Sequence, residues 1–198
     1  MNYLAHAFLS FGQAQILVGN MTSDFIKGKK KFDYPLVIQQ GISLHRSIDE
    51  FTDRHAQTLE AKKVFRPIYG LYSGAFMDIV YDHFLAKDPK IFASPGDLAD
   101  FATQTYDLIT PFQPVFPEKF QKMFHYMQLQ NWLYNYQYRE AINNSFRGLV
   151  HRSAYMHEHE SAFRIFEANY DRLKMHYEIF FPELRAFAFN RLRELTAA

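Results

Sequence analysis

Residues 41–53, GISLHRSIDEFTD, are the stretch that decides how the chain folds. Leu44, Ile48 and Phe51 recur there at positions i, i+4 and i+7, which is the period of a helix with one face in a core. Pro35 suits the first turn of such a helix, because proline lacks the N–H that a first turn leaves unpaired. The sequence therefore predicts a helix from about residue 34 to residue 55.

The same apolar period of about 3.6 residues runs through nearly the whole chain, and no alternating strand pattern interrupts it. We expect helices over residues 2–10, 13–26, 73–86, 97–109, 131–152 and 157–180, with a short last helix that starts at Pro182. The prolines between residues 111 and 117 predict an irregular connector. The predicted fold is all-α, a single-domain multi-helix bundle over residues 1–198.

Composition narrows the class of protein further. A chain of 198 residues can bury one good core but is short for two independent domains. Its 21 Phe and 13 Tyr supply much of the apolar surface, and rings at helical spacing are typical of a thick core. Cysteine is absent, which excludes disulfides, thiolate metal sites and a cysteine nucleophile.

Charge and hydropathy exclude several partners. The net charge of +1 argues against electrostatic binding of nucleic acid by the protein as a whole. The apolar runs are short and interrupted by charge, so no membrane span is expected. The N-terminal residues lack a basic segment followed by an apolar one, so we expect a cytoplasmic protein. The sequence gives no indication of the oligomeric state.

A polar stripe lies beside the apolar one on the helix predicted for residues 34–55. His45, Asp49 and Asp53 recur at i, i+4 and i+8 and cover a sector about 80° wide, which also includes Thr52. Imidazole and carboxylate groups at the border of a core suit a divalent cation. The alternative is an ordinary solvated face, because amphipathic helices often carry polar residues at this spacing.

A second helix, predicted for residues 73–86, carries a similar set. Asp78 and Asp82 are four residues apart, and His83 follows directly. By helical phase the Asp82 carboxylate points between Ala75 and Ile79, and a charge in such apolar surroundings needs a partner. This segment is therefore a second candidate source of metal ligands.

Two further helices offer ligands near the start of the chain. Asn20 and Asp24 are again four residues apart, and His6 lies on the predicted first helix. Taken alone, His6 is more typical of a hydrogen-bonded core histidine. Four helices that each present such a side chain beside the core can build a metal site inside a helical bundle.

A basic cluster follows Asp24. It is either a solvated loop or a surface for an acidic partner. Its members are Lys27, Lys29, Lys30 and Lys31.

Several motifs together resemble the acyl carrier protein phosphodiesterase family. They extend along nearly the whole chain, and their order and spacing carry the resemblance more than any one of them. The motifs are MNYLAH at residues 1–6, Gly19-Asn20 with Asp24, GIxxHRxIDxxTD at residues 41–53, DxxxDHFL at residues 78–85, NWLxxY at residues 131–136 and GLxxR at residues 148–152.

The resemblance implies a fold and an activity. The family is similar to HD-type phosphohydrolases, which are helical proteins that use Mn²⁺ or a related ion. Members hydrolyse the phosphodiester of holo-acyl carrier protein and release 4′-phosphopantetheine and apo-acyl carrier protein. Manganese is thus the expected metal, with Mg²⁺ or Fe²⁺ as alternatives. This sequence has no His-Asp dipeptide, only Asp82-His83 in the reverse order, so the HD ligand order is not transferred.

The resemblance also assigns roles to the candidate residues. We expect Asp49 or Asp82 to orient or deprotonate the attacking water, and Arg46 to lie beside the phosphate or, alternatively, on the surface. Asn20, Thr52 and Asp53 are candidates for substrate binding, and the lysine cluster is a candidate docking surface for the acidic carrier protein. The expected metal ligands are His6, Asp24, His45, Asp49, Asp78, Asp82 and His83.

Two other functions remain open at this point. The first is a phosphohydrolase of the same architecture that acts on a nucleotide or another small phosphodiester. The second is a non-catalytic helical module that binds a partner through its aromatic surface.

Overall fold

The computed structural model describes residues 1–153, 156 and 158–197. Every regular element in these ranges is a helix and none is a strand, which confirms the all-α prediction. None of the helices described is long and apolar enough to cross a membrane. The α-helices are α1 (Tyr3–Phe8), α2 (Ala14–Thr22), α3 (Leu36–Arg54), α4 (Ala56–Ala61), α5 (Arg66–Tyr69), α6 (Ser73–Ala86), α7 (Pro95–Ile109), α8 (Glu118–Leu129), α9 (Trp132–Asn135), α10 (Arg139–Arg152), α11 (Glu160–Ala168) and α12 (Tyr170–Ala197). Short 3-10 turns are η1 (Ser23–Phe25), η2 (Gly28–Asp33), η3 (Lys62–Val64), η4 (Gly70–Tyr72) and η5 (Thr110–Val115).

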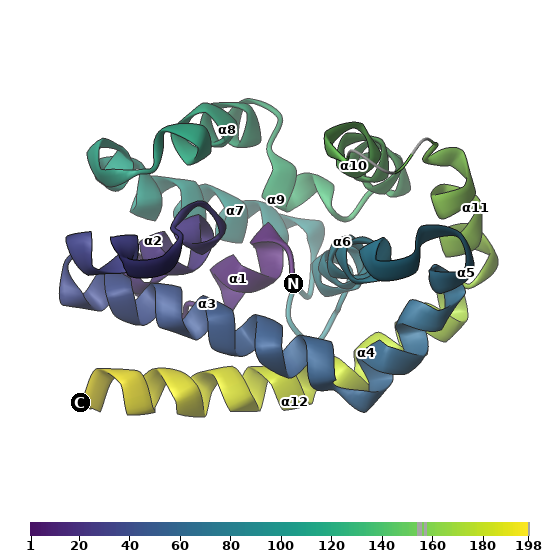
Figure 1. Cartoon of the computed structure of the whole chain (residues 1–198), viewed down its shortest axis with the longest axis horizontal. Coiled ribbons are helices and arrows are strands. Elements are labelled where there is room, and N and C mark those ends of the chain that lie inside the picture. The colour runs from purple at the N-terminus through teal and green to yellow at the C-terminus, as the bar shows by residue number, and fades with distance from the viewer. Residues whose placement is uncertain (154–155, 157, 198) are drawn as a thin grey trace.

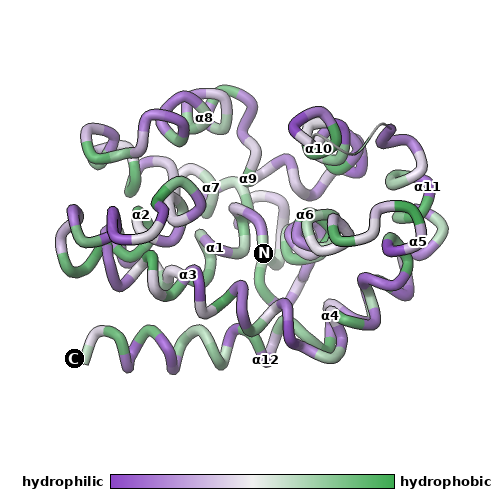
Figure 2. Tube along the Cα trace, viewed as in Figure 1, coloured by the Kyte–Doolittle hydropathy of each residue, from purple (hydrophilic) through white to green (hydrophobic). Residues whose placement is uncertain are grey.

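The helices enclose a single core. In Figure 1, α3 and α12 run side by side along one edge, and the N-terminus lies near the middle of the molecule. Apolar and polar residues alternate at helical spacing along both of these helices in Figure 2. One cluster of buried apolar side chains takes members from the start of the chain, Met1, through to Leu192 on α12.

Two glycines allow α2 to lie directly against α3. A Cβ atom on Gly19 would come 2.1 Å from the carbonyl oxygen of Ile38, and one on Gly41 would come 2.3 Å from that of Ile16. Both distances are far inside van der Waals contact with backbone atoms, so any side chain would push the helices apart. The two glycines therefore fix the spacing between α2 and α3.

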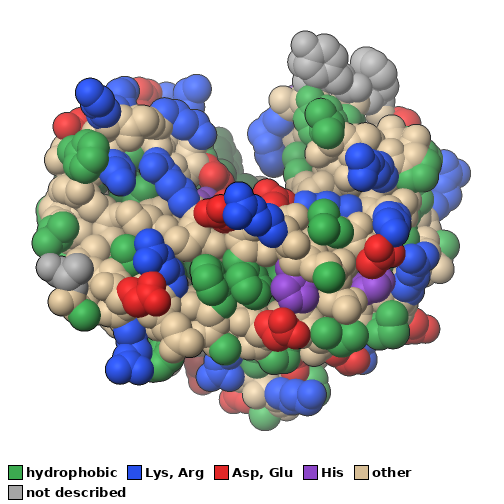
Figure 3. All heavy atoms as spheres, turned by 60° about the horizontal axis from the view of Figure 1, so that its bottom comes forward, with side chains coloured by type: hydrophobic (Ala, Val, Ile, Leu, Met, Phe, Trp, Pro, Cys, Tyr) green, Lys and Arg blue, Asp and Glu red, His purple; other side chains and the backbone are tan. Residues whose placement is uncertain are grey.

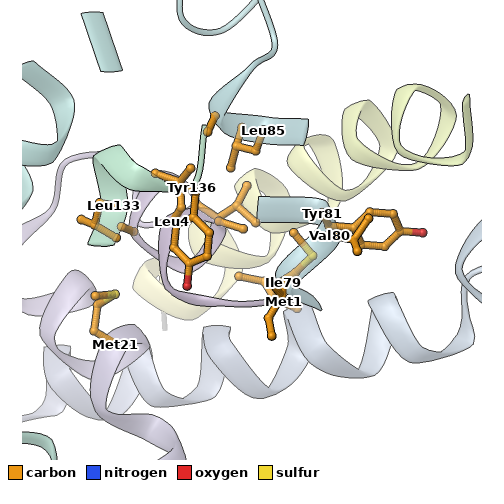
Figure 4. Close-up of a cluster of buried hydrophobic side chains, with 14 of the residues drawn as sticks. Met1, Leu4, Met21, Ile79, Val80, Tyr81, Leu85, Leu133 and Tyr136 are labelled. Atoms are coloured by element: carbon orange, nitrogen blue, oxygen red, sulfur yellow. The ribbon is translucent and has the colours of Figure 1, made fainter. Parts of the chain in front are cut away.

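The N-terminal segment is itself part of the core. In the close-up of Figure 4, Met1 and Leu4 lie among Ile79 and Val80 of α6 and Tyr136, which follows α9. Met1 is 8% exposed and Leu4 is fully buried. Packing against α6 thus holds the first residues in place and, with them, α1.

Asp82 anchors this segment from α6. Its carboxylate is fully buried and accepts backbone N–H groups of Asn2 at 3.3 Å, Leu4 at 2.7 Å and Ala5 at 3.2 Å. These amides belong to the first turn of α1, where no side chain of the helix itself supplies a cap. The N-terminus of α1 therefore supplies the partner that the buried Asp82 carboxylate requires. The helix dipole is positive at this end, which also stabilises a negative charge.

The prediction for the C-terminal helices is wrong in one respect. The break predicted just before Pro182 is absent, and Pro182 lies inside α12. The helical break lies instead at Asn169, between α11 and α12, where the Asn169 side chain donates a hydrogen bond to the Ile165 carbonyl. Pro182 and Glu178, the residue four positions earlier, are exposed, so water can solvate the carbonyl that lacks an N–H partner. Residue 157, the predicted start of this helix, lies outside the described residues.

The prolines between residues 111 and 117 interrupt the α-helices as predicted, and the chain forms the turn η5 there. Residues 118–129, for which no element was predicted, form α8. Phe120, Phe124 and Met127 of this helix are buried at i, i+4 and i+7. The predicted helix over residues 131–152 is divided into α9 and α10 by residues 136–138.

Removing the Asp82 carboxylate should destabilise the fold. Asp82→Ala leaves three N–H groups, two of them buried, without their acceptor, so we expect the free energy of unfolding to fall by about 3–5 kcal/mol. Asp82→Asn keeps one acceptor oxygen and should cost less. Urea unfolding followed by far-UV circular dichroism measures both, and a loss below about 1 kcal/mol for Asp82→Ala would contradict this anchoring role.

Candidate metal centre

Two buried histidines from different helices stack on each other. His6 lies on α1 and His45 on α3, with ring centroids 3.9 Å apart and an interplanar angle of 17°. Their Nε2 atoms both approach the carboxylate of Asp49, at 3.3 Å for His6 and 3.1 Å for His45. Ligand atoms of these three residues all lie within 4.8 Å of one another, which is close enough to share one ion.

Asn20 sets the orientation of both rings. Its side-chain Oδ1 lies 2.8 Å from His6 Nδ1, and its backbone carbonyl lies 2.7 Å from His45 Nδ1. The Asn20 amide nitrogen donates to the His6 carbonyl and to Ser10 Oγ, which identifies Oδ1 as the acceptor. Since both partners can only accept, each histidine carries a proton on Nδ1 and presents Nε2 to the site.

This arrangement fits a metal ion. A metal-binding histidine usually donates its other ring N–H to a carbonyl or carboxylate, as His6 and His45 do toward Asn20. His6 Nε2 is buried and has no hydrogen-bond partner in the described structure, although Asp49 is near. A buried nitrogen lone pair without a donor fits a cation better than it fits solvent.

Three further charged groups surround the histidines and Asp49. Asp24 in η1 lies at the mouth of the site, where its Oδ1 is 3.2 Å from His45 Nε2 and its side chain is 64% exposed. The α-amino group of Met1 is buried between Asp49 at 3.2 Å and Asp78 at 3.1 Å. The site thus combines three carboxylates with one fixed ammonium group.

Burial and charge shift the pKa values of these groups in opposite directions. Burial and the neighbouring His45 lower the pKa of His6 to about 4. Burial also acts to lower the pKa of His45, but the carboxylates of Asp24 and Asp49 outweigh it and raise that pKa to about 9. For Asp49, burial opposes ionisation, yet the Met1 ammonium and His6 hold its pKa well below the usual range. The carboxylates therefore favour a positive charge at His45, which a proton or a metal ion can supply.

The structure does not bring Asp82 and His83 into this cluster. The Asp82 oxygens point to the amides of α1. His83 places Nδ1 at 2.8 Å from the Tyr136 carbonyl and Nε2 at 3.0 Å from the Tyr170 hydroxyl. Both ring nitrogens are thus already engaged, and burial lowers the pKa of His83 to about 4, as expected for a neutral core histidine.

The remaining candidates on α3 lie around the site. Thr52 is buried and donates its hydroxyl to the Ile48 carbonyl at 2.8 Å, so it serves the helix itself. Arg46 is exposed and donates to the Ile26 carbonyl at 3.1 Å. Asp53 is exposed and pairs with Lys62 at 2.6 Å, a partner that the spacing of residues along one helix could not indicate.

The basic cluster lies next to Asp24 in the chain. Lys27, Lys29 and Lys30 are exposed and Lys31 is half-buried. A groove of about 410 Å³ adjoins them, and its lining includes Phe25, Lys30, Tyr34 and Pro117. In the space-filling view of Figure 3, the surface is hollowed between two lobes, with acidic and basic side chains along the floor and walls.

The Met1 α-amino group is the part of the site that sequence reasoning missed. It has no side-chain signature, and its contacts with Asp49 and Asp78 depend on how the N-terminal segment packs against α6. Asp24, His6, His45, Asp49 and Asp78 are the predicted ligands that the structure does bring together.

Comparison with known proteins gives a consistent family. The family model described as acyl carrier protein phosphodiesterase matches residues 1–184. The curated protein of that name from Klebsiella pneumoniae subsp. pneumoniae is 30% identical to this chain, and the match covers 96% of this chain and 99% of the relative. The protein of that name from Yersinia pestis is also 30% identical, and the match covers 93% of this chain and 95% of the relative. The Serratia proteamaculans protein is 29% identical, over 93% and 95%. No solved structure shows a significant match. The chain belongs to the acyl carrier protein phosphodiesterase family.

Proposed function

We propose that this protein is a metal-dependent phosphodiesterase that hydrolyses holo-acyl carrier protein to apo-acyl carrier protein and 4′-phosphopantetheine. One observation carries the proposal: Asn20 turns the Nε2 lone pairs of His6 and His45 toward Asp49 inside a member of this family. We further propose that residues 1–198 act as one cytoplasmic, HD-like domain.

His6, His45 and Asp49 are the groups that would hold the ion, with Asp78 and Asp24 next to them. Two imidazoles and a carboxylate suit Mn²⁺, and also Fe²⁺, while Mg²⁺ prefers oxygen ligands. A bound divalent ion supplies positive charge for the phosphate and lowers the pKa of water.

Asp24 is our candidate for orienting and deprotonating the water. One of its oxygens contacts His45, and in the described structure the other has no hydrogen-bond partner. Both oxygens of Asp49, by contrast, contact a histidine. In the balanced reaction the water oxygen bonds to phosphorus, and the bond from phosphorus to the serine oxygen breaks. One proton of the water passes to the Asp24 carboxylate, which gives it to the serine oxygen of the carrier protein as that oxygen leaves.

The chain also offers a surface for an acidic carrier protein. The exposed lysines follow Asp24 directly, so a partner docked on them would hold its phosphopantetheine serine near the site. Arg46 lies on the same side, since it donates to the Ile26 carbonyl, and it is a candidate contact for phosphate or for the partner.

Replacing either stacked histidine should remove metal and activity together. We expect His6→Ala and His45→Ala each to lower bound metal after dialysis and to reduce turnover of holo-acyl carrier protein by at least about 100-fold. Elemental analysis measures the metal. Mass spectrometry of the carrier protein measures loss of phosphopantetheine.

His125→Ala is the matched control, because His125 is exposed on α8 and contacts Tyr126 alone among the described rings. It should keep both metal and activity. Chelation of the wild-type protein should abolish turnover, and Mn²⁺ should restore it. If both site variants kept full metal and full activity, the proposed centre would be wrong.

Reversing charge on the lysine cluster should weaken carrier-protein recognition. Charges at an interface rim act mainly on encounter and on salt sensitivity. We expect Lys27→Glu with Lys29→Glu to raise KM for holo-acyl carrier protein and to flatten its salt dependence. Steady-state kinetics at several ionic strengths measure both effects.

The paired reversal Lys87→Glu with Lys90→Glu is the control, since these exposed lysines follow the C-terminal end of α6 and lie outside the lysine cluster. Turnover of a small chromogenic phosphodiester, where it is accepted, should not change in either double variant. Unchanged kinetics toward the carrier protein would show that docking occurs elsewhere. A wild-type protein that cleaves small phosphodiesters but not holo-acyl carrier protein would favour a small-molecule substrate.

A further inference from the structure

Lys62 in η3 contacts Asp53 of α3 and has an unusual environment for a lysine. Its side chain is only 17% exposed, and its Nζ lies 2.6 Å from Asp53 Oδ1. The next residue, Lys63, is 59% exposed and pairs with Glu60 one turn earlier, as surface lysines commonly do. The two neighbours thus differ sharply in burial.

Gly74 provides the space in which Lys62 lies. A Cβ atom at Gly74 would come 3.3 Å from Lys62 Cε and 3.4 Å from Lys62 Nζ. The end of the lysine chain therefore lies flat against the first turn of α6 instead of extending into solvent. A methyl group at position 74 would crowd the end of the lysine chain, which would shift by a few tenths of an ångström.

The two neighbours of the Lys62 side chain each lie one helical turn from a candidate ligand, Asp53 from Asp49 on α3 and Gly74 from Asp78 on α6. Asp53 follows Asp49 by four residues, which is about 6 Å along a helix on the same face. Asp53 and Asp49 also both act electrostatically on Asp78. The exposed Asp24 contacts His45, the ligand one turn before Asp49. Along the helix, the centre thus has Asp24 at one end and Lys62 at the other.

The hydrogen-bond donors of Lys62 are not fully used. An ammonium group has three N–H bonds. Within the part of the chain that the structure describes, Asp53 is the one acceptor that Lys62 contacts. Two donors therefore remain for a ligand, and a compact, strongly hydrated cation on a positioned chain suits a phosphate oxygen.

We propose that Lys62 forms an anion subsite that binds a non-bridging phosphate oxygen of the substrate, positioned by Gly74 and Asp53. The proposal deepens, and rests on, the phosphodiesterase function proposed above. The subsite would hold negative charge that develops on phosphate, in a place where the surrounding carboxylates alone would repel it. Lys62 is thus a substrate-binding residue that neither the motifs nor the helix spacing identifies.

The test compares Lys62→Met with Lys63→Met, a matched loss of charge at the adjacent position. Inorganic phosphate is the first probe, and isothermal titration calorimetry with the metal-loaded protein gives its Kd. We expect Lys62→Met to weaken phosphate binding at least about tenfold, and Lys63→Met to leave it unchanged. Metal content should stay at the wild-type level in both, which separates Lys62 from the metal ligands.

Turnover provides the second readout. Lys62→Met should lower kcat/KM about 100-fold, the loss typical of one electrostatic donor, and equally for holo-acyl carrier protein and a small phosphodiester. Lys62→Arg should recover part of this loss. Gly74→Ala keeps the lysine and its charge but crowds the end of its side chain. It should therefore weaken phosphate binding in the same direction by a smaller factor, and it serves if Lys62→Met folds poorly.

Two results would overturn the subsite. One is unchanged phosphate affinity in both Lys62→Met and Gly74→Ala. The other is a loss confined to holo-acyl carrier protein, which would place Lys62 in protein docking. The phosphate titration does not depend on which diester is cleaved. A wild-type protein inactive on holo-acyl carrier protein would therefore refute the proposed substrate and leave Lys62 to be judged on phosphate binding alone.

Discussion

The close crossing of α2 and α3 at Gly19 and Gly41 is the constraint on which the candidate site depends. Backbone atoms of one helix fill the space where a Cβ atom of the other would lie. Asn20, which follows Gly19, is thereby placed with its carbonyl against His45 and its side chain against His6. A slightly wider crossing would break the hydrogen bond to His45, so helix spacing and histidine orientation are set by the same contact.

The charges of the site are held in place by the N-terminal segment. Burying isolated carboxylates is costly, and α6 carries one that is fully buried, Asp82, and one that is partly buried, Asp78. Asp82 is satisfied by three amides of α1, and Asp78 by the Met1 ammonium group, which also contacts Asp49. The same contacts that neutralise these carboxylates fix α1, and α1 carries His6. The same contacts therefore anchor the N-terminal segment and assemble the metal centre.

Much of this could be predicted from local pattern, and the failures have physical causes. Helical period identified α3 and α6, and spacing on α3 identified His45 and Asp49 as neighbours. The buried stripe of Phe120, Phe124 and Met127 was a readable signal for α8 that the nearby prolines obscured. Pro182 misled because an exposed proline can remain inside a long helix that packs by its other face. The Lys62–Asp53 contact joins two helical segments, which no period within one segment can show.

The contrast between Asp82 and Asp49 shows why spacing alone could not sort ligands from structural carboxylates. Both residues lie on helices at i, i+4 from another candidate, and both contact the N-terminal segment. Asp82 meets N–H donors, which complete its hydrogen bonds and leave nothing for a cation. Asp49 accepts one hydrogen bond, from the Met1 ammonium group, and otherwise meets the Nε2 atoms of His6 and His45. The His6 Nε2 atom carries no proton, because the ring proton lies on Nδ1, where Asn20 accepts it. A cation site requires lone pairs that converge without donors between them. That condition depends on the tautomer of each histidine, and the tautomer is decided by a residue on a third helix.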